Sequence, residues 1–373
     1  MDKQEDLFMA DNVENVEKVE IESGTTLDVT DKKCPNCGAT VEYDPDLLKM
    51  ACAYCGYTRE LPQPGDGKSV DEMDFASAKL RSSVDWGTKK KSIVCKQCGG
   101  ETVYDATETA SSCPFCGSTS VMPVDDDEDV MAPGGVVPFE ISNEKAVELF
   151  NSWLKGRLFA PSAAKKSCRA ENFNGIYLPY WTYDSETTSS YEVKLGYRHK
   201  KSDGSTYYTY RTYRGVYDEF IDDQIVYASK KTDNPYIKSV STFDFKKLRA
   251  YDPQFVAGFA AERYTIGLDD GWVLAKQEIQ KTLKNHIGSQ AKKAHHADTV
   301  SNVNISTMYD KVTFKYILAP IWQANFKFND KVYNFVVNGQ TGKIAGKAPI
   351  SPLRVAIAIA IGIAILALII HFS

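Results

Sequence analysis

The sequence lacks the motifs that mark several large groups of enzymes. Its 373 residues contain no Gly-x-Ser-x-Gly elbow, no dinucleotide-binding fingerprint and no Walker loop. Histidine is scarce, with five in the chain, and the only close pair is His295 and His296, whose side chains would point in different directions in any regular element. Because no catalytic constellation is present, we expect that the protein is not an enzyme and has no catalytic residues.

An apolar leader is also absent, and the chain is slightly acidic. Residues 1–21 contain no apolar run of the kind that a secretory signal needs, so we expect a reduced, cytoplasmic environment for most of the chain. The net charge is −5, and residues 1–32 carry ten Asp or Glu against three Lys. This composition predicts a disordered acidic arm over residues 1–30. It disfavours nucleic acid as the main partner without excluding it.

Eight of the nine cysteines fall into two copies of one pattern. The first copy is Cys34-Pro35-Asn36-Cys37-Gly38 and Cys52-Ala53-Tyr54-Cys55-Gly56, with fourteen residues between Cys37 and Cys52. The same pattern recurs 61 residues later. Two residues between paired cysteines let both thiolates of a tight turn face one ion, and the following glycine permits the positive φ of that turn. We therefore predict two zinc ribbons, over residues 31–61 and 92–123. The predicted metal ligands are Cys34, Cys37, Cys52, Cys55, Cys95, Cys98, Cys113 and Cys116.

Four cysteines fill the tetrahedral shell of a zinc ion, so we expect two structural zinc ions and no catalytic metal. Disulfides are disfavoured in the cytosol, and a thioredoxin-like redox site needs one Cys-x-x-Cys beside a βαβ unit. Four thiolates also suit an iron–sulfur cluster, an alternative that the spacing alone leaves open. A ribbon of about 25 residues is too small to fold around an apolar core of its own, so metal binding supplies its folding free energy.

Two segments rich in loop-forming residues flank the second ribbon. Residues 62–91 form a predicted linker, in which residues 74–84 have the pattern of a short helix. Gly67-Lys68-Ser69 resembles the end of a phosphate-binding loop, but Pro62 stands where that motif needs its first glycine. Lys89-Lys90-Lys91 has no interleaved aromatics, which is typical of a solvated loop. Residues 124–135 contain five consecutive acidic residues and predict an acidic hinge.

Residues 136–348 have the composition of one globular domain rich in Tyr and Phe. Ser142 is the predicted N-cap of a helix that has Ala146, Phe150, Trp153 and Leu154 on one face. A second helix over residues 271–287 is expected to end at Gly288, with an apolar stripe of Trp272, Ala275, Ile279, Leu283 and Ile287. Alternating aromatics predict antiparallel strands over 136–139, 175–184, 191–197, 206–213, 224–227, 311–323, 325–328 and 332–338. The predicted fold class is α+β, with two small zinc ribbons, an antiparallel-sheet-rich domain and one transmembrane helix.

Asp184 lies beside Trp181 and Tyr183 and could be a carboxylate of a functional site, but we interpret it as a carboxylate that caps a turn at the end of a strand. Cys168, the ninth cysteine, has no partner suggested by the sequence, and we interpret it as an ordinary small side chain.

The end of the chain contains an unbroken apolar run. Residues 355–370 consist of Ala, Ile, Val, Leu and one Gly, and they predict a transmembrane helix over residues 353–372, because twenty helical residues rise about 30 Å. Lys347 and Arg354 precede the run, so we expect a single pass through the cell membrane with the N-terminal region in the cytoplasm. Ala356, Ala360 and Ala364 would permit self-association through the span, and a purely lipid-facing anchor is the alternative.

Several segments resemble those of a known family. They are Asn174-Gly175-Ile176-Tyr177-Leu178-Pro179-Tyr180-Trp181, Gly258-Phe259-Ala260-Ala261-Glu262, Ala319-Pro320-Ile321-Trp322 and residues 337–346. With the twin ribbons, they resemble bacterial membrane-anchored zinc-ribbon proteins, often labelled transcription factor IIB-type zinc ribbons or relatives of the primosomal replication helicase. The similarity runs from about Cys34 to the tail. Because the helicase nucleotide motifs are absent, the resemblance implies no helicase activity here. Some relatives are encoded with phage-shock-type and SPFH (flotillin-like) membrane proteins, which implies a recruiting role.

These observations leave three functions to compare. We favour a membrane-tethered zinc-ribbon adaptor that recruits or scaffolds cytoplasmic or membrane-associated proteins, with SPFH or phage-shock-type proteins as the class that the resemblance implies. The second hypothesis is a membrane-held regulator that binds nucleic acid through its ribbons, and the third is an enzyme of unknown reaction. Tight nucleic-acid binding at physiological salt would favour the second.

Overall fold

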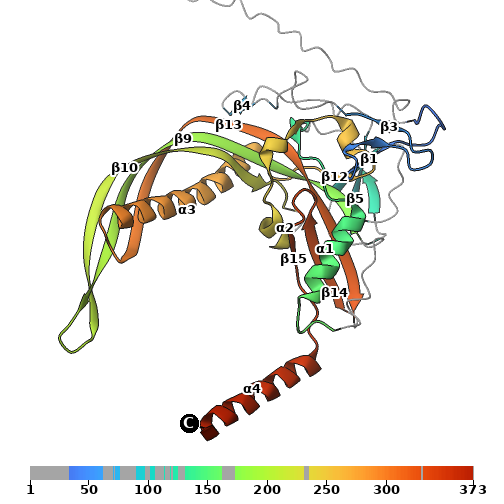
Figure 1. Ribbon diagram of the computed structural model, residues 1–373. Coiled ribbons are helices and arrows are strands. Elements are labelled where there is room, and N and C mark those ends of the chain that lie inside the picture. The colour runs from blue at the N-terminus through green and yellow to red at the C-terminus, as the bar shows by residue number, and fades with distance from the viewer. Residues whose placement is uncertain are drawn as a thin grey trace, which may run out of the picture.

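Three long strands that lie side by side organise the molecule (Figure 1). Strand β9 (Phe173–Lys200) lies between β10 (Thr206–Tyr227) and β13 (Thr299–Phe328) and pairs antiparallel with both. The predicted breaks between shorter strands are wrong here, since residues 191–197 are an internal part of β9. Between Pro179 and Gly196 the sequence has no proline or glycine that would end a strand.

The structure is a computed structural model. It describes residues 33–61, 70, 72–75, 90–96, 101–105, 113, 118, 121–124, 131–161, 173–230, 235–328 and 331–372. Over these residues the chain is α+β, as the sequence predicts, with a sheet-rich domain and one long apolar helix at the C-terminal end. The predicted acidic arm, Gly67-Lys68-Ser69, Lys89, Cys98, Cys116, Cys168 and the acidic half of the predicted hinge, residues 125–130, lie outside the described residues.

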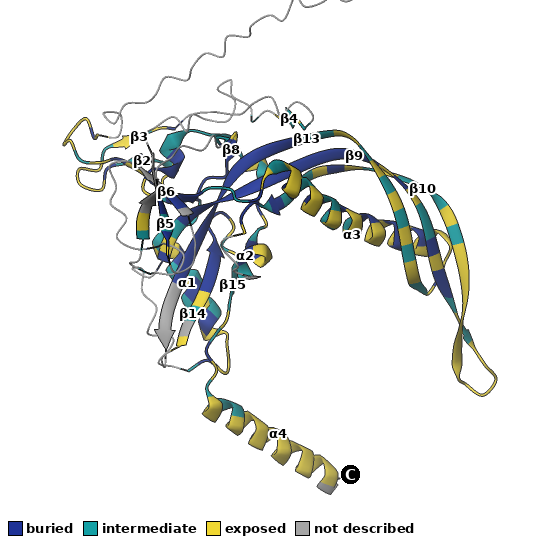
Figure 2. Ribbon diagram, turned by 180° about the vertical axis from the view of Figure 1, so that it is seen from behind, coloured by how far each residue is buried: buried dark blue, intermediate teal, exposed yellow. Residues whose placement is uncertain are grey.

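The long strands bend where two of them carry a β-bulge at the same level. The register with β9 shifts on β10 between Ile221 and Gln224, and on β13 between Asp310 and Thr313. Both shifts lie opposite Asp184 and its neighbour Ser185. Bulges bend a strand and increase its twist, and the three strands form an arch (Figures 1 and 2).

Helix α3 (Leu268–Ala294) lies beneath this arch, along its concave side (Figure 1). Four residues of its predicted apolar stripe are buried, Ala275, Ile279, Leu283 and Ile287, while the fifth, Trp272, is partly buried. The predicted end at Gly288 is wrong, because α3 continues for six more residues. Gly288 is buried inside the helix beside Val300 and Val303 of β13, so this glycine does not end the helix.

The other end of the arch is the apolar core, where short strands extend the large sheet. Its order is β11-β8-β13-β9-β12-β6-β5-β7, with β14, β15 and β4 attached through β13. The described strands of the second cysteine unit belong to this sheet, since β6 pairs with β12. The additional strands are β4 (Met73–Asp74), β5 (Lys90–Cys95), β6 (Glu101–Asp105), β7 (Val121–Val124), β8 (Gly135–Val136), β11 (Arg249–Ala250), β12 (Ala260–Glu262), β14 (Lys331–Asn338) and β15 (Ile344–Gly346).

Strand β4 replaces part of an expected helix. Asp74 was the predicted start of a short helix, but it pairs with Thr313 of β13. The next residue, Phe75, donates its backbone N–H to the Val312 carbonyl at 3.1 Å and packs its ring edge-on to Phe314. The remainder of that predicted helix, residues 76–84, lies outside the described residues.

Helix α1 (Asn143–Lys155) closes the core at the lower end of the sheet (Figure 1). Ser142 caps it as predicted, and the Ser142 hydroxyl accepts a hydrogen bond from the Lys145 backbone N–H. Phe150 is fully buried and stacks on Phe335 of β14 at 3.9 Å between ring centroids. The shorter helical segments are α2 (Pro235–Val240), η5 (Phe245–Lys247) and η6 (Pro253–Val256).

Helix α4 (Pro352–Phe372) leaves the domain at the end of the chain. Residues 352–370 are long and apolar enough to cross a membrane, which makes α4 a candidate span by length and composition. Its first turn is held by the turn that follows α1, because the Arg354 guanidinium donates from Nη1 to the carbonyls of Leu158 (3.1 Å) and Ala160 (2.7 Å). Residues 356–370 are exposed, so packing against the described domain does not fix the direction of the helix.

Candidate metal centre

The first cysteine set converges on one point. The four Sγ atoms of Cys34, Cys37, Cys52 and Cys55 all lie within 4.8 Å of one another. Cys34 Sγ is 3.3 Å from Cys55 Sγ, and Cys37 Sγ is 3.6 Å from Cys52 Sγ. A disulfide needs about 2.05 Å, and the four thiols are free. Bonds of about 2.3 Å to a central zinc place tetrahedral sulfurs about 3.8 Å apart, so the four thiols fit such an ion with little adjustment.

Each pair of cysteines sits in the same kind of turn. In the first, the Cys34 N–H donates to the Ala39 carbonyl at 2.7 Å, and the Gly38 N–H donates back to the Cys34 carbonyl at 2.8 Å. The second turn repeats both bonds at Cys52 and Gly56, at 2.8 and 3.0 Å. Gly38 and Gly56 have φ values of 75° and 72°, which confirms the prediction that a glycine permits this turn.

Backbone N–H groups of the second turn point at its first sulfur. Hydrogen bonds from the N–H groups of Cys55 and Tyr54 lower the pKa of the Cys52 thiol to about 7. Since a metal binds the thiolate rather than the thiol, this lowered pKa favours the ligand form of Cys52, whereas the neighbouring thiols and burial raise the pKa of Cys37 and Cys55. The short strands between the turns hold the two pairs together as a three-stranded sheet of β1 (Glu42–Asp44), β2 (Lys49–Ala51) and β3 (Thr58–Arg59).

The second cysteine set is described only in part. Cys95, at the end of β5, and Cys113 are both 1% exposed and belong to the core that includes Ala260 of β12. The Cys113 N–H donates to the Ser118 carbonyl at 2.7 Å, which is the same five-residue bond that opens both turns of the first set. The other two cysteines of this set lie outside the described residues, so the structure brings together four of the eight predicted ligands.

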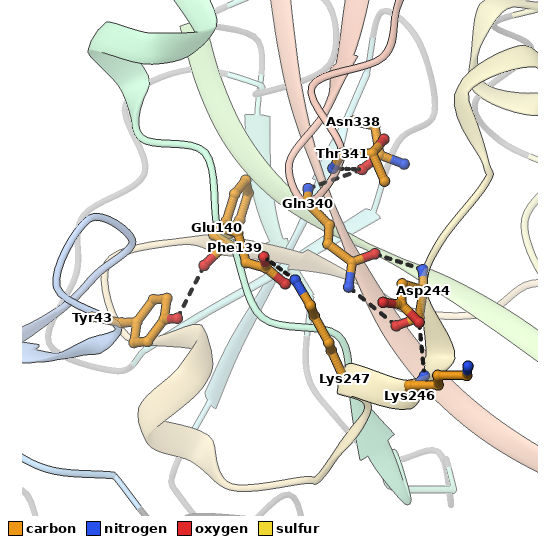
Figure 3. A network of polar contacts seen from close by, with 9 residues as sticks. All are labelled: Tyr43, Phe139, Glu140, Asp244, Lys246, Lys247, Asn338, Gln340 and Thr341. Carbon is orange, nitrogen blue, oxygen red and sulfur yellow. Dashed lines mark hydrogen bonds and ion pairs between the residues drawn. The ribbon is translucent and has the colours of Figure 1, made fainter.

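The first cysteine unit packs on the α+β domain through Tyr43. The Tyr43 hydroxyl donates to the Phe139 carbonyl at 3.0 Å (Figure 3), and the centroid of the Tyr43 ring lies 5.7 Å from that of Phe255. Beside this contact is a cavity of about 220 Å³ that the unit and the domain line together. Its lining residues are Tyr43, Leu48, Leu61, Pro138, Glu140, Lys247, Arg249 and Phe255.

The charges at this cavity are not fully paired among the described residues. Lys247 Nζ forms an ion pair with Glu140 at 2.7 Å, as Figure 3 shows. Arg249 has a buried Nη1 that makes no hydrogen bond with the part of the chain that the structure describes. Because Lys247 and Glu140 neutralise each other, Arg249 leaves the cavity with a local positive charge, and the rest of its wall is mostly apolar.

Asp184 is not at the end of a strand, so the interpretation as a turn-capping carboxylate is wrong. It lies in the middle of β9 opposite the β10 bulge, is 2% exposed, and its Oδ1 accepts a hydrogen bond from the Asp223 N–H at 2.5 Å. Burial raises the pKa of Asp184 to about 6. This cluster could not be predicted from the sequence, because its other members, Glu72, Asp223 and Lys315, come from three separate segments.

A lysine occupies the position that a cation would take in this acidic cluster. Lys315 Nζ lies 3.0 Å from Asp223 Oδ1, 3.2 Å from Glu72 Oε1 and 3.7 Å from Asp184 Oδ2. We therefore interpret the cluster as an internal ion-pair network at the bend of the arch. The histidines stay apart from both groups, and the adjacent pair separates, since His295 stacks on Tyr213 while His296 has a positive φ of 50°.

Along most of its length the chain is similar to a Bacillus subtilis protein. That protein, from strain 168, is described as "Uncharacterized protein YdjG", and the two are 27% identical over 329 residues, which cover 87% of this chain and 91% of the relative. No family model and no solved structure matches the chain. The similarity extends over nearly all of both proteins and assigns no activity to either.

Proposed function

We propose that the chain is a membrane-tethered adaptor in which two zinc ribbons, each with a structural zinc ion, help to present a surface to partner proteins. The observation that carries the proposal is the closed group of four thiols at Cys34, Cys37, Cys52 and Cys55. Four thiolates fill the tetrahedral shell of zinc and leave no position for a substrate or an activated water. A site of this kind stabilises a fold, so the proposal assigns binding and no reaction to the chain.

In this proposal α4 is a single span of the cell membrane, and the rest of the chain lies in the cytoplasm. Four apolar side chains surround the start of the helix with large exposed fractions: Leu158 (80%), Phe159 (42%), Ile350 (63%) and Leu353 (70%). Arg354 ties this group together through its hydrogen bonds to the turn after α1. Exposed apolar residues around a cation suit the boundary between lipid headgroups and hydrocarbon.

We place the partner-binding surface at the turn between β1 and β2. Leu47 and Leu48 in this turn are 49% and 50% exposed, and Leu48 has a φ of 54°, a conformation that a leucine adopts at a cost of about 1 kcal/mol or more. Leu48 also lines the cavity that contains Arg249. The partner that fits is a protein segment with an apolar side chain and a nearby carboxylate. The SPFH or phage-shock class remains the one that the resemblance implies.

Leu48→Asn tests the partner surface without weakening the fold. Asparagine tolerates positive φ better than leucine, so we expect unfolding at an unchanged or slightly higher temperature, together with reduced recovery of the partner from detergent-solubilised membranes. The full-length protein and the exposed control variant Lys145→Ala, on α1, should recover the partner equally. Recovery unaffected by Leu48→Asn would refute the assignment of the surface.

Metal analysis tests the two zinc ribbons, and membrane extraction tests the span. We expect two zinc ions per full-length chain and retention of the protein in membranes at alkaline pH. Iron with visible absorption, or one metal ion per chain, would overturn the two-ribbon proposal. Deletion of residues 353–373 should release the protein into the soluble fraction while its partner loses its membrane location. A partner that stays at the membrane would show that recruitment is not the function.

A further inference from the structure

The tip of the β9–β10 hairpin, residues 196–212, concentrates positive charge in a chain of net charge −5. It carries Arg198, Lys200, Lys201 and Arg211 against the single acidic residue Asp203. The Asp203 carboxylate accepts the Ser205 N–H at 2.8 Å within the turn. None of the four cations forms an ion pair with another residue that the structure describes. Asp298 lies near Arg198, but it accepts only the Arg198 backbone N–H, at 2.7 Å.

Exposed tyrosines accompany these cations. Tyr207, Tyr208 and Tyr210 are 44%, 44% and 50% exposed. Tyr208 pairs with Arg198 across the hairpin, and Tyr210 pairs with Gly196. Cross-strand partners project from the same face of a sheet, so Tyr208, Tyr210 and Arg198 share one face. The Tyr210 ring lies across Gly196, where an added Cβ would stand 2.9 Å from its Cε1 atom, so the glycine makes room for the ring.

The arch brings this tip down to about the same height as the start of α4, on the opposite side of the molecule (Figures 1 and 2). In both views the hairpin descends from the bend to about the level at which α4 leaves the domain (Figures 1 and 2). Two exposed parts of the domain therefore lie at about this height: the apolar side chains around Arg354 at the start of α4, and the tip of the hairpin. A flat surface below the arch that touches the first part would also touch the second.

We propose that the hairpin tip is a second membrane contact and that it binds the headgroups of anionic lipids. The proposal rests on the proposed span at α4. Each Lys or Arg close to an anionic membrane surface adds about 1 kcal/mol of attraction, or about fivefold in binding, and tyrosine is enriched where headgroups meet hydrocarbon. A bilayer is favoured over nucleic acid because the tip lies level with the start of the candidate span.

The experiment places a photoreactive side chain at three positions of the full-length protein in lipid nanodiscs. p-Benzoylphenylalanine replaces Tyr208 at the tip, Val216 farther along the same face of β10, or Ile365 in α4, and mass spectrometry of the irradiated protein measures covalent lipid adducts. The nanodiscs contain phosphatidylcholine alone or with about 30% phosphatidylglycerol, which supplies the negative surface charge. Val216 is 65% exposed, so it is a matched control for accessibility.

We expect lipid adducts at Ile365 in both nanodiscs, at Tyr208 only with phosphatidylglycerol, and none at Val216. The double substitution Arg198→Glu and Lys200→Glu should lower the Tyr208 adduct about tenfold or more, and 1 M salt should lower it as well. Absence of adducts at Ile365 would refute the span itself. Adducts at Ile365 with none at Tyr208 would overturn only the tip contact. Capture of an added single-stranded oligonucleotide at Tyr208 in place of lipid would assign the tip to nucleic acid instead.

Discussion

Gly271→Ala tests how closely α3 is packed beneath the arch. Gly271 lies in the first turns of α3, and a Cβ added there would stand 2.9 Å from Trp181 Cδ1 and closer still to the Tyr183 hydroxyl. Neither ring can move away freely. The Trp181 indole N–H donates to the Ile266 carbonyl at 2.8 Å, and the Tyr183 hydroxyl donates to the Leu268 carbonyl at 2.8 Å. The methyl group therefore displaces α3 or breaks one of these hydrogen bonds.

The expected loss of stability follows from three contributions. Overpacking costs about 1–3 kcal/mol, and a lost hydrogen bond costs about 1 kcal/mol. Alanine is a better helix former than glycine by about 1 kcal/mol at most, which offsets part of this cost. The net loss of unfolding free energy is about 2 kcal/mol, which corresponds to a decrease of roughly 4–8 °C in the unfolding temperature for a domain of this size.

Gly288→Ala is the matched control in the same helix. The nearest atoms to its added Cβ are methyl groups of Val303 and Val300 at 3.3–3.7 Å, close to ordinary contact. We expect unchanged or slightly higher stability there, because the helix-propensity gain of about 1 kcal/mol meets little opposition. Thermal unfolding of the full-length protein in detergent, followed by circular dichroism, measures both variants. Equal unfolding temperatures for the two variants would refute the packing argument.

Three further predictions concern buried polar groups and the metal. Asp184→Asn should raise the unfolding free energy, measured in urea titrations, by about 1–2 kcal/mol between pH 6 and 8. The reason is that the raised pKa of Asp184 gives stability that is complete below about pH 4 and is lost as the pH rises through about 6. A gain that persists undiminished at pH 4 would contradict this prediction. Asn338→Ala should cost about 3 kcal/mol, since the Asn338 side chain donates to the Val240 and Thr242 carbonyls and accepts the Gln340 and Thr341 N–H groups, the latter two drawn in Figure 3. Cys34→Ser should lower the zinc content from two ions to one, and an unchanged content would contradict the assignment of the first site.

Local signals in the sequence predicted the elements whose structure depends on near neighbours. Ser142 caps α1 because its hydroxyl meets an N–H three residues away, and Gly38 has the positive φ that its turn needs. The buried stripe of α3 was predictable from the four-residue spacing of Ala275, Ile279 and Leu283. In each case the interacting groups lie within a few turns of the chain, so spacing alone specifies the contact.

The features that the sequence did not reveal depend on distant segments. The sequence predicts that the helix ends at Gly288, but Val300 and Val303 pack on this residue and the helix continues. Asp184 reads as a strand-end residue because its neighbours in the cluster follow 39 and 131 positions later, at Asp223 and Lys315. A single sequence contains no signal for such pairings, since each strand of a large sheet can be placed beside many others.

The bend of the arch offers a reason for a buried ion-pair network that stability alone does not favour. Replacing buried charges with apolar side chains is often neutral or stabilising, so the cluster around Lys315 needs another explanation. Its hydrogen bond from the Asp223 N–H to Asp184 holds Asp223 at a φ of 49° in the β10 bulge, and Lys315 links that bulge to Glu72 beside β13. In a ribbon of strands more than twenty residues long, a register slip of one residue would turn every side chain to the opposite face. We infer that the network fixes the register at the bend, and so determines which face of the tip carries Arg198 and Tyr208.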